Sequence, residues 1–230
     1  MAAGTGQTAV TLYPVGNYNF GVKAPIIDKD ATFEEALARM QQKYAREGAR
    51  RSVEAVLLVH EHHHPHVLLL QVGSSFFKLP GGRLRPGENE VDGLKRKLTN
   101  KLAPEAAALK TDWEVGECLG TFWRPSFDLA MFPYLPAHCT RPKEVRKLFL
   151  VPLPEKCYFA VPKNLKLLAV PLFELYDNVA RYGPLIAALP SFLSRLRFTL
   201  AGDPVQQPLP ALPAPGAAET HREDMEEVYG

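Results

Sequence analysis

Apolar residues in several segments of the chain follow the spacing of an α-helix. One set recurs at i, i+3, i+7 and i+11, as in a helix with one face on a core; its members are Val91, Leu94, Leu98 and Leu102. An earlier helix is predicted to end at Gly48, and its start carries the capping-box pair Thr32 and Glu35. Two helical patterns come late in the chain, at 172–176 and 185–196, the second interrupted by a proline.

Continuous apolar runs predict the strands. The runs 53–59 and 67–72 flank a segment with histidine and proline, so a β-hairpin is the economical interpretation. Further strands are predicted near 113–123 and 148–153. This mixture of helices and strands predicts an α/β fold with a mixed sheet between helical layers.

Composition divides the 230 residues into one domain and two ends. Residues 1–9 are small and polar, and residues 199–230 are rich in proline and alanine with an acidic end; we expect both to be disordered. The domain is expected to span 10–198, which is long enough to bury one substantial core. Within it, 11–29 is predicted to be an ordered arm that packs on the domain.

Charge and cysteine content narrow the class of protein. The formal net charge of +2 does not by itself indicate a nucleic-acid binder, so local patches have to carry that case. The three cysteines have no CxxC spacing, which favours reduced thiols in the cytosol or nucleus over a secreted disulfide scaffold. There is no long apolar run or signal peptide, so we expect a soluble intracellular protein without membrane contact.

Residues 82–101 keep the frame of the Nudix box, a pyrophosphatase motif, without its carboxylates. The box reads G-x5-E-x7-R-E-U-x-E-E-x-G-U, with U apolar, and the chain is similar to it at Gly82, Glu88, Arg96 and Leu98. At the three clustered glutamates the chain instead has Lys97, Asn100 and Lys101.

These replacements argue against a metal site. Mg²⁺ and Mn²⁺ prefer oxygen ligands, and Glu88 alone is a poor site. Two ammonium groups oppose a divalent ion strongly, since a unit charge pair about 4 Å apart is worth roughly 4 kcal/mol at an effective dielectric near 20. We therefore predict no metal, no cofactor and no ordinary Nudix hydrolase activity. The segment Leu79-Pro80-Gly81-Gly82 is interpreted as a retained structural turn, and Arg96 as a partner in an internal ion pair.

Longer segments give a closer resemblance, to the small Nudix-fold subunit of pre-mRNA cleavage factor I. It extends from about residue 11 to residue 198 and is carried by the segments RRSVE (50–54), VLLLQVG (67–73), FFKLPGG (76–82), WRP (123–125), YLPAH (134–138), AVPKN (160–164) and PLFELYDN (171–178).

The resemblance implies an αβα Nudix sandwich that binds RNA without hydrolysing it. That family is a homodimeric nuclear factor that recognises UGUA elements in single-stranded pre-mRNA. It pairs with a larger subunit that carries an RNA-recognition motif, and it works with poly(A) polymerase and other 3′-end processing factors. The region of Phe132, Pro133 and Tyr134 resembles the part of the family that meets the large subunit, with core packing as the alternative.

The resemblance also assigns RNA contacts by position. Phe76 matches a phenylalanine that stacks on a base, and Glu54 matches a glutamate that bonds a base edge. Four further positions match RNA-contacting residues or the adjoining loop: Ser75, Phe77, Tyr182 and Gly183. Two positions depart from the family pattern: Asp28 replaces a glutamate, and Ala36 replaces an arginine. Arg39, one turn later, is hypothesised to replace that arginine weakly.

The assigned chemistry suits single-stranded RNA. A base stacked on an aromatic ring is worth about 1 to 3 kcal/mol, and a carboxylate can accept from both N1–H and N2–H₂ of guanine. From the residues alone, the phenylalanine pair could be ordinary strand core, although alternation in a strand would turn one ring inward and the other outward. Glu54 could equally be a solvated strand end paired with Arg50 or Arg51.

Three other groups of residues have a simple structural explanation beside a functional one. The five histidines within 60–66 could capture a metal or form a solvated hairpin turn. The basic residues at 141–147 could contact phosphates or be a solvated face; they are Arg141, Lys143, Arg146 and Lys147. Cys139 follows His138, but adjacency in sequence seldom makes a nucleophilic dyad.

Three hypotheses remain after the sequence is read. The first is a non-catalytic RNA-binding subunit of the 3′-end processing machinery. The second is a nucleotide-binding or residual Nudix hydrolase that acts on dinucleoside polyphosphates. The third is an assembly scaffold whose partner alone reads RNA.

Overall fold

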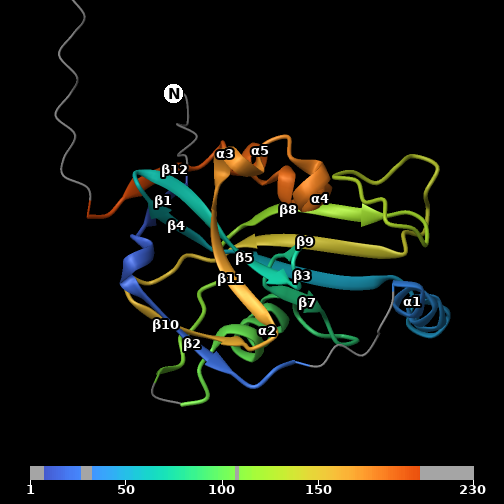
Figure 1. Cartoon of the computed structure of the whole chain (residues 1–230). Helices are drawn as coiled ribbons and strands as arrows, with labels where there is room; N and C mark the ends of the chain where they lie inside the picture. The colour runs from blue at the N-terminus through green and yellow to red at the C-terminus, as the bar shows by residue number, and fades with distance from the viewer. Residues whose placement is uncertain (1–7, 27–32, 107–108, 203–230) are drawn as a thin grey trace, which may run out of the picture.

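The computed structural model describes residues 8–26, 33–106 and 109–202 (Figure 1). The helices are α1 (Phe33–Glu47), α2 (Glu90–Leu102), α3 (Leu172–Leu175), α4 (Val179–Ala187), α5 (Leu189–Leu193) and the 3-10 turn η1 (Val15–Asn17). The first strands are β1 (Ala9–Leu12), β2 (Tyr18–Lys23), β3 (Arg50–Val56), β4 (Leu58–Glu61), β5 (His64–Val72) and β6 (Phe76–Lys78). The others are β7 (Gly81–Arg83), β8 (Cys118–Arg124), β9 (Glu144–Leu150), β10 (Cys157–Pro162), β11 (Leu165–Pro171) and β12 (Arg197–Leu200).

The strands form two larger groups, one mixed and one antiparallel. One has the order β7-β3-β9-β8, in which β3 and β9 are parallel and the outer pairs are antiparallel. The other has the order β11-β5-β4, with β6 added to β5. Two parallel pairs, β1 with β12 and β2 with β10, attach the N-terminal arm to the rest of the fold.

Helices cover both faces of the strands, as Figure 1 shows with α2 on one side and α3, α4 and α5 on the other. Successive residues of β3 and β4 enter opposite cores: Val56 and Leu58 join the core below α3 to α5, whereas Ala55 and Leu57 join the core against α2. Burial on both faces explains why these strands appear as continuous apolar runs. The predicted mixed sheet between helical layers is confirmed.

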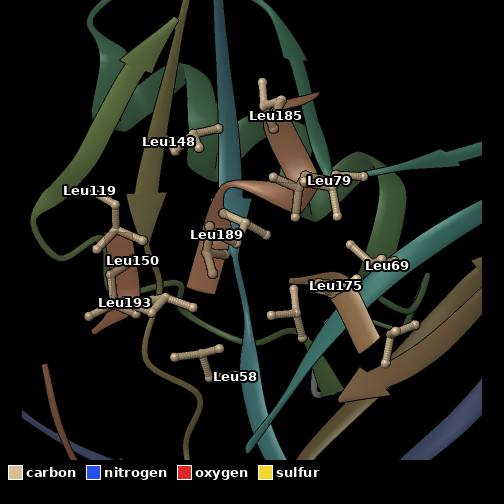
Figure 2. Close-up of a cluster of buried hydrophobic side chains, with 14 of the residues drawn as sticks. Leu58, Leu69, Leu79, Leu119, Leu148, Leu150, Leu175, Leu185, Leu189 and Leu193 are labelled. Atoms are coloured by element: carbon tan, nitrogen blue, oxygen red, sulfur yellow. The ribbon is translucent and has the colours of Figure 1, made fainter. Parts of the chain in front are cut away.

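Leucines dominate the core between the strands and the C-terminal helices. Figure 2 shows side chains of the strands facing those of the helices, among them Leu58, Leu69, Leu148, Leu175, Leu185 and Leu189. This core anchors α4, which in turn lies against β6.

The predicted hairpin exists with a different first strand. β5 pairs with β4, and the turn between them is formed by His62 and His63, both with positive φ. β3 instead pairs with β7 and β9 in the other group. The error arose because the run 53–59 continues from β3 into β4 without a break, which hides the passage from one group of strands to the other.

Several predicted boundaries change. Gly48 ends α1 with φ 73°, as predicted, whereas Thr32 and the capping box lie outside the described residues. Pro190 breaks the last helical pattern, so that α4 ends at Ala187 and α5 starts at Leu189. β12 continues to Leu200, two residues past the expected end of the domain.

Two further predictions need correction. Trp113 is buried but precedes β8 rather than lying in a strand. Val91 is 38% exposed, so the core face of α2 is made by Gly93 and the three leucines instead. Among the described residues, no helix has the length and apolar character needed to cross a bilayer.

Candidate nucleic-acid interface

A cleft of about 570 Å³ lies where α1, β6, β7 and α2 meet the start of β3. Its lining residues are Ala36, Arg39, Met40, Lys43, Tyr44, Gly48, Arg50, Phe76, Arg83, Lys97 and Lys143. Six of these side chains are lysine or arginine, and none of the described lining residues is acidic. We call this hollow the cationic cleft; its charge favours a ligand with several negative groups.

Phe76 and Phe77 point to opposite sides of β6. Phe76 is 62% exposed and lines the cleft, whereas Phe77 is buried, its ring centroid 4.8 Å from that of Tyr182. The alternation expected of neighbouring strand residues is therefore present. An exposed phenylalanine ring held at the edge of a rigid strand can stack on a flat ligand.

Helix α1 forms one wall of the cleft. Ala36 and Arg39 both line it. Arg39 therefore lies at the same wall as Ala36, the position where the resemblance implies an arginine. Lys143 enters from the segment before β9, and its Nζ atom lies 4.4 Å from the centre of the Tyr44 ring. A cation over an aromatic face is held in place without a carboxylate partner.

The glycine pair at 81–82 lies in β7, which pairs with β3. A Cβ atom at Gly81 would lie 2.2 Å from the carbonyl oxygen of Val53, so only glycine allows this approach of β7 to β3. At Gly82 a Cβ atom would meet the Lys97 side chain, 3.5 Å from Cε. The two glycines therefore lie in a strand rather than in the predicted turn, with a structural role in strand pairing. The Lys97 side chain packs close to the backbone of β7.

The frame of the Nudix box is retained as an ion pair. Nε and Nη2 of Arg96 each donate to a different carboxylate oxygen of Glu88 at 2.6 Å, and the Arg85 amide donates to Glu88 at 2.7 Å. The hydrogen bond from Arg96 is the main reason why the pKa of Glu88 falls to about 2. Arg96 thus has the internal role predicted for it.

The donor set near this frame does not fit the divalent ion that the Nudix box implies. Glu88 is occupied by Arg96, and the neighbouring positions supply two lysines and an amide. Among the described residues, no group of three histidine, cysteine or acidic side chains could hold a metal ion.

Next to the cleft, with which they share Arg50, β3, β8 and β9 place five charged residues in a buried charge cluster, which comprises Arg50, Glu54, Arg124, Glu144 and Arg146. Glu144 is fully buried, with nitrogen atoms of the three arginines 3.1 to 3.4 Å from its carboxylate. Ser52 donates to the same carboxylate at 2.9 Å. Burial alone would raise the pKa of Glu144, but the arginines outweigh it and hold the pKa at about 2.

Glu54 is part of the cluster and is not a solvated strand end. It is 8% exposed, and its Oε1 lies 3.2 Å from Nη1 of Arg146 rather than pairing with Arg51. Burial raises its pKa, and Arg146 is the strongest of the charges that oppose the rise. Glu54 does not line the cleft; it lies four residues along β3 from the cleft residue Arg50.

The remaining predicted contacts lie beside β6 or outside the described residues. Tyr182 is buried, and its hydroxyl donates a hydrogen bond to the Glu174 carboxylate. Burial is the main reason why the pKa of Tyr182 rises to about 12, and the hydrogen bond to Glu174 adds to the rise. Gly183 has φ 79°, and a Cβ atom added to it would meet no atom within 4 Å. Ser75 is exposed in the turn before β6, and Asp28 lies outside the described residues.

The other groupings divide between core and surface. His60 and His66 are buried, whereas His62, His63 and His64 are exposed at the hairpin turn as the bland interpretation predicted. In the basic run at 141–147, Lys143 lines the cleft, Arg146 joins the cluster and Lys147 pairs with Glu90. The sulfur of Cys139 lies 4.0 Å from the carbonyl oxygen of Pro125, which gives no support to a dyad with His138.

Sequence reasoning missed Arg83 and Glu144. Arg83 follows the glycine pair and is ion-paired with Glu47 at the cleft. Glu144 offered a usable signal, because a single carboxylate inside a basic run indicates a buried counter-charge.

The chain is similar to a known protein family over most of its length. The family model NUDIX_2, described as a nucleotide hydrolase, matches residues 8–196. Pre-mRNA cleavage factor Im 25 kDa subunit 2 of Arabidopsis thaliana is 62% identical over 191 residues, which cover 83% of this chain and 96% of the relative. Cleavage and polyadenylation specificity factor subunit 5 of Dictyostelium discoideum is 49% identical over 191 residues, with coverages of 82% and 94%. The chain belongs to the Nudix family of cleavage factor Im 25 kDa subunits.

Both the resemblance and the fold class predicted from the sequence are thereby confirmed. Relatives of this cleavage factor Im chain are subunits of factors for pre-mRNA cleavage and polyadenylation. Among solved structures, the Nudix domain of Shewanella oneidensis NrtR complexed with ADP ribose is similar, with 19% identity, a TM-score of 0.44, and coverage of 71% of this chain and 97% of the other.

Proposed function

We propose that this chain binds single-stranded RNA with a preference for UGUA-like elements, as a non-catalytic subunit of the pre-mRNA 3′-end processing machinery. The observation that carries the proposal is the exposed ring of Phe76 in a cleft with six cationic side chains. Single-stranded nucleic acid presents flat bases and a chain of phosphates, and proteins bind it with aromatic platforms in positively charged grooves.

Base choice is assigned to Glu54 and to the loop around Phe76. A carboxylate accepts from the two neighbouring N–H donors of guanine, and Nη1 of Arg146, 3.2 Å away, holds Oε1 of Glu54. Ser75, Phe77, Tyr182 and Gly183 are proposed to contact the RNA beside the stacked base; because the rings of Phe77 and Tyr182 are buried, their contacts are expected from the backbone. Asp28 is proposed to supply a further carboxylate.

A non-catalytic role follows from the charges on α2. Lys97 and Lys101 replace two metal-binding glutamates, and Asn100 replaces the third. A cation at these positions repels Mg²⁺, whereas stacking and base-edge hydrogen bonds require no metal.

Assembly is proposed to follow the family: a homodimer in the nucleus that joins a larger subunit with an RNA-recognition motif, poly(A) polymerase and other 3′-end factors. An exposed apolar patch between β8 and β9 supports a partner surface there. Its members are Leu129, Tyr134 and Leu135, exposed by 70%, 58% and 41%.

The test is binding of the full chain to a fluorescein-labelled UGUA-containing RNA and to its single-base variants, in EDTA at 0.1 M salt. Phe76→Ala is expected to weaken binding by roughly 1 to 3 kcal/mol, as for loss of one stacked base. Glu54→Gln is expected to reduce the preference for guanine. Phe173→Ala is the matched control, because Phe173 is 67% exposed on α3 and does not line the cleft.

Each contrary result has a separate meaning. No binding by the unmodified chain contradicts the RNA proposal. Binding by the complex with its large partner that survives Phe76→Ala assigns RNA reading to the partner and makes this chain a scaffold.

Nucleotide binding or hydrolysis is the second candidate. It is favoured by the match to a family model described as a nucleotide hydrolase and by a cleft of about 570 Å³, which is large enough for a nucleotide. Turnover of a dinucleoside polyphosphate that starts on addition of Mg²⁺ or Mn²⁺ and stops in EDTA would favour it over RNA binding.

A further inference from the structure

Lys97 occupies a glutamate position of the Nudix box and lines the cationic cleft. Its side chain lies on the backbone of β7, and a Cβ atom added to Gly82 would be 3.7 Å from its Nζ atom. The absence of a side chain at Gly82 leaves room for this arrangement. The lysine is therefore packed against a rigid strand instead of extending freely into solvent.

The surroundings of Lys97 offer its charge little compensation. Burial lowers its pKa, Arg96 lowers it further, and Glu88 acts in the opposite direction. Both oxygens of Glu88 already accept hydrogen bonds from Arg96. Within the part of the chain that the structure describes, Lys97 makes no hydrogen bond or ion pair.

Other lysines of α2 are in a different position. Nζ of Lys95 lies 3.4 Å from Asp112 on the exposed side of the helix. The charge of Lys101 acts on Glu54 and lowers the pKa of that carboxyl. Lys97 is thus the α2 lysine that lines the cleft and whose charge the protein leaves for a ligand.

We propose that Lys97 binds a phosphate oxygen of the RNA strand directly, so that a fixed ammonium stands where the Nudix box places a glutamate for a metal ion. The inference rests on the proposed RNA-binding function. Phe76 lines the same cleft, so a strand with one base on that ring has its phosphates within the cleft. The phosphate of a free nucleotide has the same chemistry, so a nucleotide is the alternative ligand for Lys97.

The test measures affinity of the full chain for the labelled UGUA RNA between 0.05 and 0.5 M salt in EDTA. The affinity falls as salt rises, and loss of one phosphate contact makes this negative slope of log K against log salt shallower by about 0.7 for a single strand. Binding is then about fivefold weaker at 0.1 M salt and little changed near 1 M. Lys97→Met is expected to show this pattern. Lys97→Arg is expected to stay close to the unmodified chain, and Lys95→Met is the matched control.

The results separate this inference from the proposed function. If Phe76→Ala weakens RNA binding while Lys97→Met leaves the salt slope unchanged, the Lys97 contact is wrong and the RNA function stands. If the unmodified chain binds no RNA, both are wrong. If Lys97→Met weakens binding of ATP in EDTA but not of RNA, the phosphate belongs to a nucleotide and the inference is overturned.

Thermal melting of each variant separates a lost contact from a lost fold. Lys97→Gln replaces Lys97→Met if the latter does not fold, and the same change in salt slope is expected of it.

Discussion

The buried charge cluster and the cationic cleft share Arg50 and lie in one region of the protein, yet they differ in how their cations are balanced by carboxylates. In the cluster, three arginines surround Glu144 at 3.1 to 3.4 Å. In the cleft, six cations line the walls, and no acidic side chain stands among the described lining residues. The cluster balances its arginines with the carboxylates of Glu54 and Glu144, whereas Lys97 in the cleft has no ion pair among the described residues. We propose that the cleft charges bind a ligand. Arg50 belongs to both regions and connects them.

The largest effect is expected from Glu144→Gln. The change leaves three arginines next to a buried neutral amide, and removal of one partner of a buried ion pair costs about 3 to 5 kcal/mol. Chemical denaturation should show this loss in the free energy of unfolding. Glu90→Gln is the control: its pairs with Arg51 and Lys147 are partly exposed, so a change below about 1 kcal/mol is expected. Equal losses would contradict the distinction between core and surface charge.

Acid should weaken the cluster by a comparable amount. The pKa of Glu144 is about 2 in the folded protein and 4.5 in its usual state, so ionised Glu144 stabilises the fold fully above pH 4.5. This contribution, about 3 kcal/mol, is lost as the pH falls from 4.5 towards 2. Denaturation at a series of pH values should show a smaller decline in Glu144→Gln than in the unmodified chain. Identical declines would contradict the depressed pKa.

Arg39→Ala tests the cleft rather than the cluster. We expect RNA binding at most about fivefold weaker at 0.1 M salt, with little change in the free energy of unfolding, because the residue lines the cleft wall. Ala36→Arg should strengthen binding from the same wall. Arg46→Ala, at the exposed end of α1, is the control. If Arg39→Ala leaves both affinity and base preference unchanged, Arg39 does not replace the family's arginine.

Lys143→Met should have the smallest effect. It separates two roles of this residue, packing on aromatic rings and contact with an RNA phosphate. Nζ of Lys143 lies 4.4 Å from the Tyr44 ring centre and 5.5 Å from that of Phe127, and loss of such contacts costs about 0.5 to 1 kcal/mol of stability. The salt slope of RNA binding should also fall by about 0.7 if Lys143 contacts a phosphate. A loss of stability without a change in slope would make Lys143 a structural cation.

Local pattern predicted α2, its retained Glu88–Arg96 frame and the inward and outward rings of β6, because these depend on residues within a few positions of one another. It did not predict the partners of β3. Its apolar run continues into β4 without a break, although the two strands belong to different groups. The buried state of Glu54 was also missed, because its partner Arg146 is far away in sequence.

By itself, the sequence determined that the clustered glutamates of the Nudix box are absent and that position 97 is a lysine, because the identity of a residue does not depend on the fold. Only the tertiary structure decided which cations share a cleft and which are neutralised. Lys97 and Lys101 are four residues apart on one helix, yet one lines the cleft and the other acts on Glu54. The physical reason is that the fate of a charge depends on the residues packed against it, and here these come from strands and helices far apart in the chain.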